Sequence, residues 1–203
     1  MILKAVISLI FAGFMLYRRR DIKRLFAYSS IEHMGIMTFA FGMGGPLANF
    51  AGLLHMTMHS LIKSAIFFAV GHIAQVKGTQ QIAQIRGLSV THPVLAVGLS
   101  LGVIAIAGLP PFGMFLSEFM LVSTSFARQP LLALVLVFGL ILAFGALVLR
   151  LQNVLFGEPT GPRGGVKASY VPLFIHLAIV LTAGLWLPEP VVRWVRTVAA
   201  QLG

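Results

Sequence analysis

The sequence contains no cysteine. It can therefore hold neither a disulfide framework, nor a thiolate metal site, nor an iron–sulfur cluster. It also lacks the alternating apolar pattern of barrel strands, a Gly-rich nucleotide loop ending in lysine, and the HExxH motif of metal-dependent hydrolases. We therefore expect no cofactor and no metal in this chain, and any redox chemistry associated with it would belong to a different subunit.

Acidic residues are scarce, with 5 Asp and Glu against 15 Lys and Arg, which gives a formal net charge of +10. In a soluble protein this excess would suggest a nucleic-acid partner. Charged residues, however, make up only 10% of the chain and hydrophobic residues 58%, whereas a soluble domain has about 25% charged residues. We therefore expect lipid as the surrounding solvent and no nucleic acid as partner.

Long apolar runs define the expected fold, since about 20 helical residues cross the hydrocarbon core of a bilayer. The candidate spans are residues 25–44, 50–76, 93–109, 131–149 and 170–187, with shorter apolar runs at 1–16 and 112–126. Lys4, near the start of the first run, argues against a cleaved secretory signal. We expect an all-α, polytopic transmembrane helix bundle, a single domain over residues 1–203, in the inner (plasma) membrane.

Basic residues gather in the connections, and the densest cluster is the loop at residues 17–24, with five basic residues and one acidic residue. The positive-inside rule predicts that this loop faces the cytoplasm. The tail at residues 188–203 carries Trp194 beside Arg193 and Arg196 among small apolar residues. Such a composition suits a short interfacial helix.

The same rule bears on the segment between residues 93 and 149. If 93–109 leaves the cytoplasm and 112–149 returns as one interrupted element, Arg150 falls inside, together with Arg163 and Lys167. A separate full span at 112–126 would place them outside. We therefore expect a broken helix near Pro110 and Pro111.

The interruption itself has a chemical signature. Pro110 and Pro111 remove two backbone donors and prevent a continuous helix, and Gly108 precedes them. Glu118 follows within the next apolar segment, and broken spans beside a buried acid are common at ion sites. A plain packing kink would explain the prolines but not Glu118.

Glu32 and His33 lie inside the apolar run at residues 25–44. At 1.5 Å per residue they are roughly 10–13 Å from its start at Leu25. An ionisable group near the bilayer centre costs at least about 2.5 kcal/mol, and these two side chains cannot snorkel to water from that depth. The pair indicates either an ion path or a helix-packing hydrogen bond.

The apolar run at residues 50–76 contains His55, His59 and Lys63 at positions i, i+4 and i+8, which form one slanted stripe on a helix. Histidine changes charge near neutral pH, and a buried lysine can exchange its proton. The stripe therefore predicts a proton relay. Polar residues that hold helices together are the alternative, although Ser or Thr would serve that purpose as well. His72, near the end of the run on the opposite side, carries less weight.

Three motifs occur in order: "RRRDIKRLFAYSSIEHMGIM", "HSLIKSAIFFAVGHI" and "AGLPPFGMFLSEFML". In these the chain resembles the antiporter-like subunits of respiratory complex I, the Mrp cation/proton antiporters and the membrane subunits of energy-converting hydrogenases. It looks most like the hydrogenase-4 component F type of formate-hydrogenlyase-like complexes. Members of this family are much longer and contain two inverted helix repeats, so the resemblance implies that this chain corresponds to the C-terminal part.

In that family, protons cross the membrane along a central row of buried Lys, His and Glu. The resemblance assigns Lys23 a buried place in the row, whereas its loop position alone would make it one more surface charge. The candidate proton path comprises Lys23, Glu32, His33, His55, His59, Lys63 and Glu118.

The resemblance implies a proton-translocating, non-catalytic membrane subunit of a respiratory hydrogenase or complex I-like oxidoreductase. Other membrane subunits of such an assembly would be its partners. Two alternatives remain at this point. One is a component of an Mrp-type cation/proton antiporter, driven by ion gradients, and the other is a structural membrane anchor for a peripheral enzyme.

Overall fold

The computed structural model describes residues 1–161 and 169–202, so Arg163 and Lys167 lie outside the described residues. In the described part every regular element is a helix, and the only β pairing is an isolated bridge between Asp21 and Gln81. The all-α expectation is confirmed. The elements are α1 (Ile2–Arg18), α2 (Ile22–Met43), α3 (Pro46–Lys77), the short 3-10 turn η1 (Ile82–Gln84), α4 (Leu88–Thr91), α5 (Pro93–Ile106), α6 (Gly113–Arg128), α7 (Pro130–Phe156), α8 (Val171–Leu185) and α9 (Glu189–Gln201).

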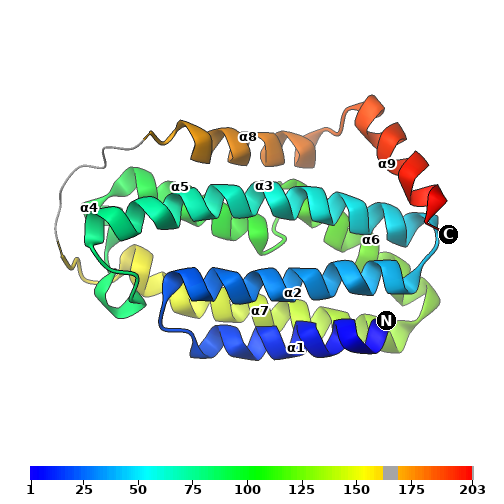
Figure 1. Cartoon of the computed structure of the whole chain (residues 1–203), viewed down its shortest axis with the longest axis horizontal. Coiled ribbons are helices and arrows are strands. Elements are labelled where there is room, and N and C mark those ends of the chain that lie inside the picture. Colours follow the sequence, from blue (N-terminus) through cyan, green and yellow to red (C-terminus); the bar gives the residue numbers. More distant parts are fainter. Residues whose placement is uncertain (162–168, 203) are drawn as a thin grey trace.

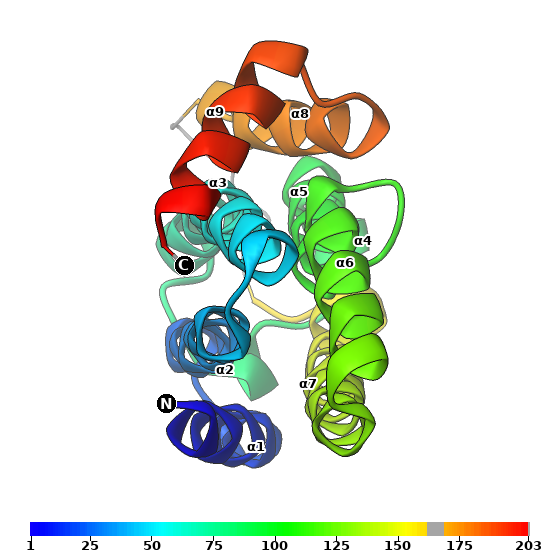
Figure 2. The same cartoon turned by 90° about the vertical axis from the view of Figure 1, so that its right-hand side faces the viewer.

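The long helices lie side by side along one direction (Figure 1). Seen along that direction, α3 is surrounded by α2, α5, α6 and α8 (Figure 2). The helices α1 and α7 lie at the edge of the bundle away from α8. Because α3 has 32 residues, it is about 48 Å long at 1.5 Å per residue. It therefore runs the full height of the bundle and is the element on which the others are organised.

Local sequence sets the hairpin between α2 and α3. Asp21 caps α2, and its carboxylate accepts a hydrogen bond from the backbone N–H of Arg24 at 2.9 Å. Gly44 and Gly45 follow α2 with φ values of 62° and 84°, a backbone region that suits glycine. Pro46 then begins α3 at a position where its missing N–H costs nothing.

The broken element is formed by α5 and α6 together. Gly102 of α5 lies against Ile66 of α3, and Gly113 of α6 lies against Met58 of α3. Residue numbers rise along α5 and α6 while they fall along α3, so the two short helices lie end to end, antiparallel to α3. The interruption near Pro110 and Pro111 is therefore confirmed.

The segment expected to form one interrupted element, residues 112–149, does not do so, and that prediction is wrong. Arg128 ends α6 at the Gly44 end of the bundle, where its guanidinium donates to the carbonyl oxygen of Gly44 at 2.5 Å. Pro130 then starts α7, which runs back as a continuous helix. Hydropathy alone missed this reversal because the sequence stays apolar on both sides of the turn. Arg150 still reaches the end of the bundle that carries the loop at residues 17–24, as expected.

By length and composition, α3 and α7 could each cross a membrane, and α8 with α9 could form a third span bent by 81°. The outer faces of α1 and α7 are apolar and exposed: Phe11 and Phe14 are each 54% exposed, and Ile141 is 63% exposed. Such surfaces fit contact with lipid. In α9, Trp194 is 66% exposed, and its interfacial placement stays a prediction.

Candidate functional site

Three helices bring ionisable side chains together at mid-height of the bundle. Glu32 and His33 come from the middle of α2, the stripe predicted on α3 faces them, and Glu118 comes from α6. All of these side chains are buried. The exposed fractions are 2% for Glu32, 2% for His33, 1% for His55, 5% for His59, 6% for Lys63 and 8% for Glu118.

A chain of polar contacts crosses the three helices. Oε2 of Glu32 lies 3.3 Å from Nε2 of His33. Nδ1 of His33 lies 3.0 Å from Nε2 of His55, and Nδ1 of His55 lies 3.1 Å from Oγ of Ser117. Each histidine therefore uses both ring nitrogens, as a side chain that passes a proton through its ring must do.

The hydrogen bonds of the Ser117 hydroxyl determine the tautomers of His55 and His33. A hydroxyl has one proton, and Ser117 donates its proton to the carbonyl oxygen of Met114 at 2.7 Å. It therefore accepts from Nδ1 of His55. The other nitrogen of a neutral imidazole carries no proton, so Nε2 of His55 accepts from Nδ1 of His33. Nε2 of His33 and Oε2 of Glu32 then share a single proton.

Lys63 lies beside this chain. Its Nζ donates to the backbone carbonyl oxygen of Phe26 at 2.8 Å and lies 5.5 Å from the centre of the Phe26 ring. It forms no ion pair with a described carboxylate, but it is close enough to Glu32 for an electrostatic interaction. The ammonium group is thus buried with one hydrogen-bond acceptor in place.

Two atoms of the cluster have no hydrogen-bond partner within the described structure. They are Nε2 of His59 and Oε1 of Glu32. The ring of His59 lies 5.2 Å from that of His33, centre to centre. Buried polar atoms normally have partners, so each of these two atoms can take up a further donor or acceptor. His59 therefore extends the cluster on the α3 side.

Glu118 is seated at the break between α5 and α6. Its carboxylate lies directly against Gly108, which has φ +66° and no room for a side chain. Ligand atoms of Glu118, His33 and His55 lie within 4.8 Å of one another. The break therefore accommodates the acid next to the two histidines.

We expect Gly108→Ala to destabilise the protein and to displace Glu118. A non-glycine residue with positive φ costs roughly 1–3 kcal/mol, and the added Cβ would meet the carboxylate. Thermal unfolding of the purified protein should shift to lower temperature. Gly71→Ala on α3 is the matched control, because its added Cβ meets nothing within 4 Å. A Gly108→Ala protein with unchanged melting would contradict this seating of Glu118.

Most residues predicted to form the path come together, but Lys23 does not. Its side chain is exposed in the first turn of α2, about 13 Å along the helix from Glu32 at 1.5 Å per residue. The burial implied by the resemblance is therefore wrong for Lys23 in this structure. His72 also lies outside the cluster, where its ring packs edge-on against Tyr170 at 5.7 Å.

Sequence reasoning missed Ser117. A serine inside an apolar helix is usually explained by a hydrogen bond to its own backbone, which Ser117 also makes. The available signal was its position next to Glu118, on the segment that follows the break.

His33, His55 and Glu118 could together offer three ligands to a divalent cation. The two imidazoles, however, are already hydrogen-bonded to each other at 3.0 Å. This arrangement suits a shared proton better than two ligands that point at one ion, so we interpret the cluster as a site for proton transfer.

Comparisons with known proteins identify the family of this chain. The family model described as "NADH:quinone oxidoreductase/Mrp antiporter, TM" matches residues 1–143. The chain is 62% identical over 187 residues to the hydrogenase-4 component F homolog of Methylacidiphilum infernorum, covering 92% of this chain and 39% of that protein. It is 26% identical over 193 residues to NADH-quinone oxidoreductase subunit M of Escherichia coli K12, covering 92% and 38%. The chain thus spans about two fifths of the length of these relatives.

Two solved structures share the fold. One is a chain of the membrane-bound sulfane sulfur reductase, an archaeal respiratory membrane complex, with a TM-score of 0.89 and 24% identity over 99% of this chain and 41% of that one. The other belongs to the Mrp complex from Dietzia sp., with a TM-score of 0.87 and 20% identity over 99% and 46%. At these identities the likeness shows the transmembrane bundle fold alone.

Proposed function

Since the chain belongs to the NADH:quinone oxidoreductase/Mrp antiporter family of transmembrane subunits, we propose that it relays protons across the inner (plasma) membrane through its buried cluster. The hydrogen-bonded row from Glu32 through His33 and His55 to Ser117 carries this proposal. Each ionisable group inside a membrane span is costly. A bundle that served only as an anchor would need none of them.

The contacts support a stepwise transfer. When Nε2 of His33 takes a proton from Glu32, His33 becomes an imidazolium. Its Nδ1 proton can then pass to Nε2 of His55 over 3.0 Å. His55 can then release its own Nδ1 proton toward Ser117 and Glu118. Lys63, close to Glu32, can compensate the charge that moves along the row by releasing and regaining its own proton. Both rings must return to their first tautomers before the next proton follows.

The relatives support a particular assembly. The chain is 62% identical to a hydrogenase-4 component F homolog, and we propose that it works with the other membrane subunits of a hydrogenase or complex I-like oxidoreductase. Its partners would carry the electron chemistry. An Mrp-type antiporter component is supported less, because a probable K⁺/H⁺ antiporter protein of Rhizobium meliloti is only 33% identical over 57% of this chain.

The orientation of the bundle follows from its basic end. We propose that the loop at residues 17–24 faces the cytoplasm and that Lys23, exposed at this end, lies at the entrance rather than in the buried row. We further propose that residues 1–203 form one transmembrane domain, in which residues 188–203 lie at the membrane surface.

The test compares two buried histidines on α3. We expect His55→Gln to lower proton uptake by about 100-fold, the lower end of what a positioned proton-transfer group contributes. His72→Gln is the matched control, since His72 is also buried but lies outside the row. Uptake would be measured in inverted vesicles that contain the native assembly, beside its electron-transfer rate and the abundance of the protein. Equal uptake by the two variants would leave only the anchor function.

A further inference from the structure

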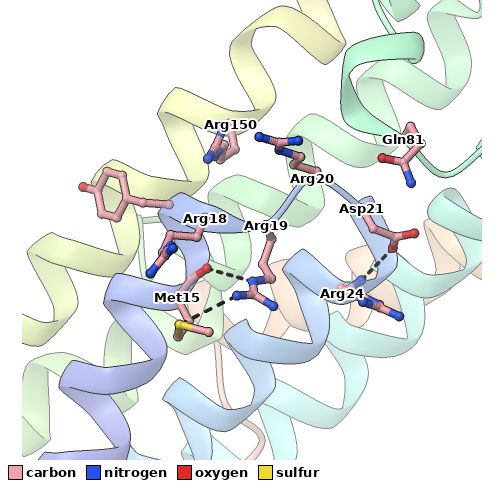
Figure 3. Close-up of a pocket in the computed structure, with 9 residues that line it drawn as sticks. Met15, Arg18, Arg19, Arg20, Asp21, Arg24, Gln81 and Arg150 are labelled. Atoms are coloured by element: carbon pink, nitrogen blue, oxygen red, sulfur yellow. Dashed lines mark hydrogen bonds between the residues drawn. The ribbon is translucent and has the colours of Figure 1, made fainter.

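The basic end of the bundle contains a cavity of about 990 Å³ between α1, α2 and α7. We call it the arginine cavity, because five arginines line it. They come from α1, from the connection between α1 and α2, from the start of α2 and from α7 (Figure 3). The five are Arg18, Arg19, Arg20, Arg24 and Arg150.

The described carboxylates compensate only a small part of the charge in this cavity. Five arginines and one acid, Asp21, leave a formal charge of 5 − 1 = +4. The carboxylate of Asp21 accepts the backbone N–H of Arg24 as a helix cap, and none of the lining arginines forms an ion pair with a described carboxylate. Like charges around one cavity repel one another, and an anion in the cavity would relieve that repulsion.

One arginine is held in place by its neighbours. The Nε of Arg19 donates to the carbonyl oxygen of Met15 at 3.2 Å, and its guanidinium lies 4.5 Å from the centre of the Tyr28 ring. The side chains of Arg18, Arg20 and Arg150 make no such contact within the described structure. Guanidinium groups with free donors bind phosphate oxygens in a forked geometry. The chemistry of the lining therefore favours a phosphate group.

Apolar surface beside the cavity identifies the source of that phosphate. On α1, Phe14 is 54% exposed, one turn before the first lining arginine. On α7, Leu149 is 54% exposed, directly before Arg150. Leu149 also lines a second cavity of about 610 Å³, which shares Arg19, Arg20, Gln81 and Arg150 with the first and adds Arg86. A ligand that binds the arginines and also covers this apolar surface has an anionic head and an apolar tail.

We propose that the arginine cavity binds the phosphate group of an anionic phospholipid, whose acyl chains lie along the exposed apolar faces of α1 and α7. The bound headgroup joins three elements that the protein itself leaves mutually repulsive at this end. It thereby holds the turn before α2 against α7, and α2 carries Glu32 and His33. Basic pockets between transmembrane helices are suited to such headgroups. The proposal does not depend on the proton relay.

The test uses the native assembly in detergent after its lipid has been removed. We expect phosphatidylglycerol to raise the melting temperature and to remain bound in native mass spectrometry, whereas phosphatidylcholine and inorganic phosphate do neither. Replacing Arg18, Arg20 and Arg150 by Gln should weaken phosphatidylglycerol binding by roughly fivefold per arginine, about 100-fold in all. Arg193→Gln on α9 is the control, since Arg193 is exposed beside Glu189 at 4.0 Å and should leave binding unchanged.

Each other result would overturn the proposal. Equal stabilisation by phosphatidylcholine would show a general lipid effect, and equal stabilisation by inorganic phosphate would show a site for a soluble anion. An equal loss in the Arg193 variant would show unspecific charge attraction. A delipidated assembly that gains nothing from phosphatidylglycerol would show that another protein of the assembly fills the cavity. If the triple variant does not assemble, the comparison of lipids on the wild-type assembly still decides the question.

Discussion

Glu118→Gln should lower proton translocation by about 100-fold while the protein keeps its normal abundance in the membrane. Glutamine has the shape of the carboxylate and can fill the same place against Gly108, so packing at the break should survive. It cannot gain or release a proton at neutral pH. Because Glu118 lies within 4.8 Å of His33 and His55, that loss removes one end of the row.

Two further variants make the result specific. Glu118→Asp keeps an ionisable group and should retain more translocation than Glu118→Gln. Glu189→Gln applies the same chemical change to an exposed glutamate on α9, 70% accessible, and should leave translocation unchanged. Proton pumping and protein abundance would be measured on the same membranes. Normal pumping in Glu118→Gln would make Glu118 a packing residue and remove the break from the path.

Lys63 should be the second residue whose loss stops translocation. We expect Lys63→Ala to reduce it by about 100-fold, more than it reduces assembly. Lys63→Arg should fail to restore it, because arginine stays protonated in proteins. If Lys63 served only to donate to the carbonyl of Phe26, a permanently charged donor would replace it well.

Lys77 provides the matched control on the same helix. It is buried to a similar degree, 7% exposed against 6% for Lys63, and donates to the carbonyl oxygen of Thr160 at the basic end. Lys77→Arg should therefore leave proton pumping intact at matched abundance. The assignment of Lys63 to the path fails if Lys63→Arg pumps like the wild type.

The positions of most long helices could be predicted from the sequence because these helices coincide with long apolar runs. Residues 50–76 were expected to form a span and lie within α3 (Pro46–Lys77), and residues 131–149 lie within α7 (Pro130–Phe156). Hydropathy could not show which helices pair. The chain reverses at Gln129, between two apolar segments, with little change in polarity. Hydropathy therefore joins residues 112–149 into one interrupted element, whereas in the structure α5 and α6 form the broken element and α7 is a separate helix.

The site was predictable to the extent that buried charge is conspicuous in an apolar sequence. The stripe of His55, His59 and Lys63 follows from helical spacing alone, and the structure brings it to Glu32 and His33. The tautomer assignment was out of reach, since it depends on Ser117, which comes from a helix 62 residues away in sequence from His55. The depth of Lys23 was misjudged because a motif match carries no information on exposure.

The close contact between α8 and the break has a consequence for synthesis. Gly184 of α8 lies directly against the carbonyl oxygen of Pro111 and the peptide that follows it, so α8 covers a stretch of backbone that the prolines leave without helical partners. In hydrocarbon, every unsatisfied peptide group costs several kcal/mol. Gly184 leaves the ribosome 184 − 111 = 73 positions after Pro111. Until α8 arrives, that stretch must be sheltered by the insertion machinery or by water, so the break can be fully covered within the bilayer only after α8 has been translated.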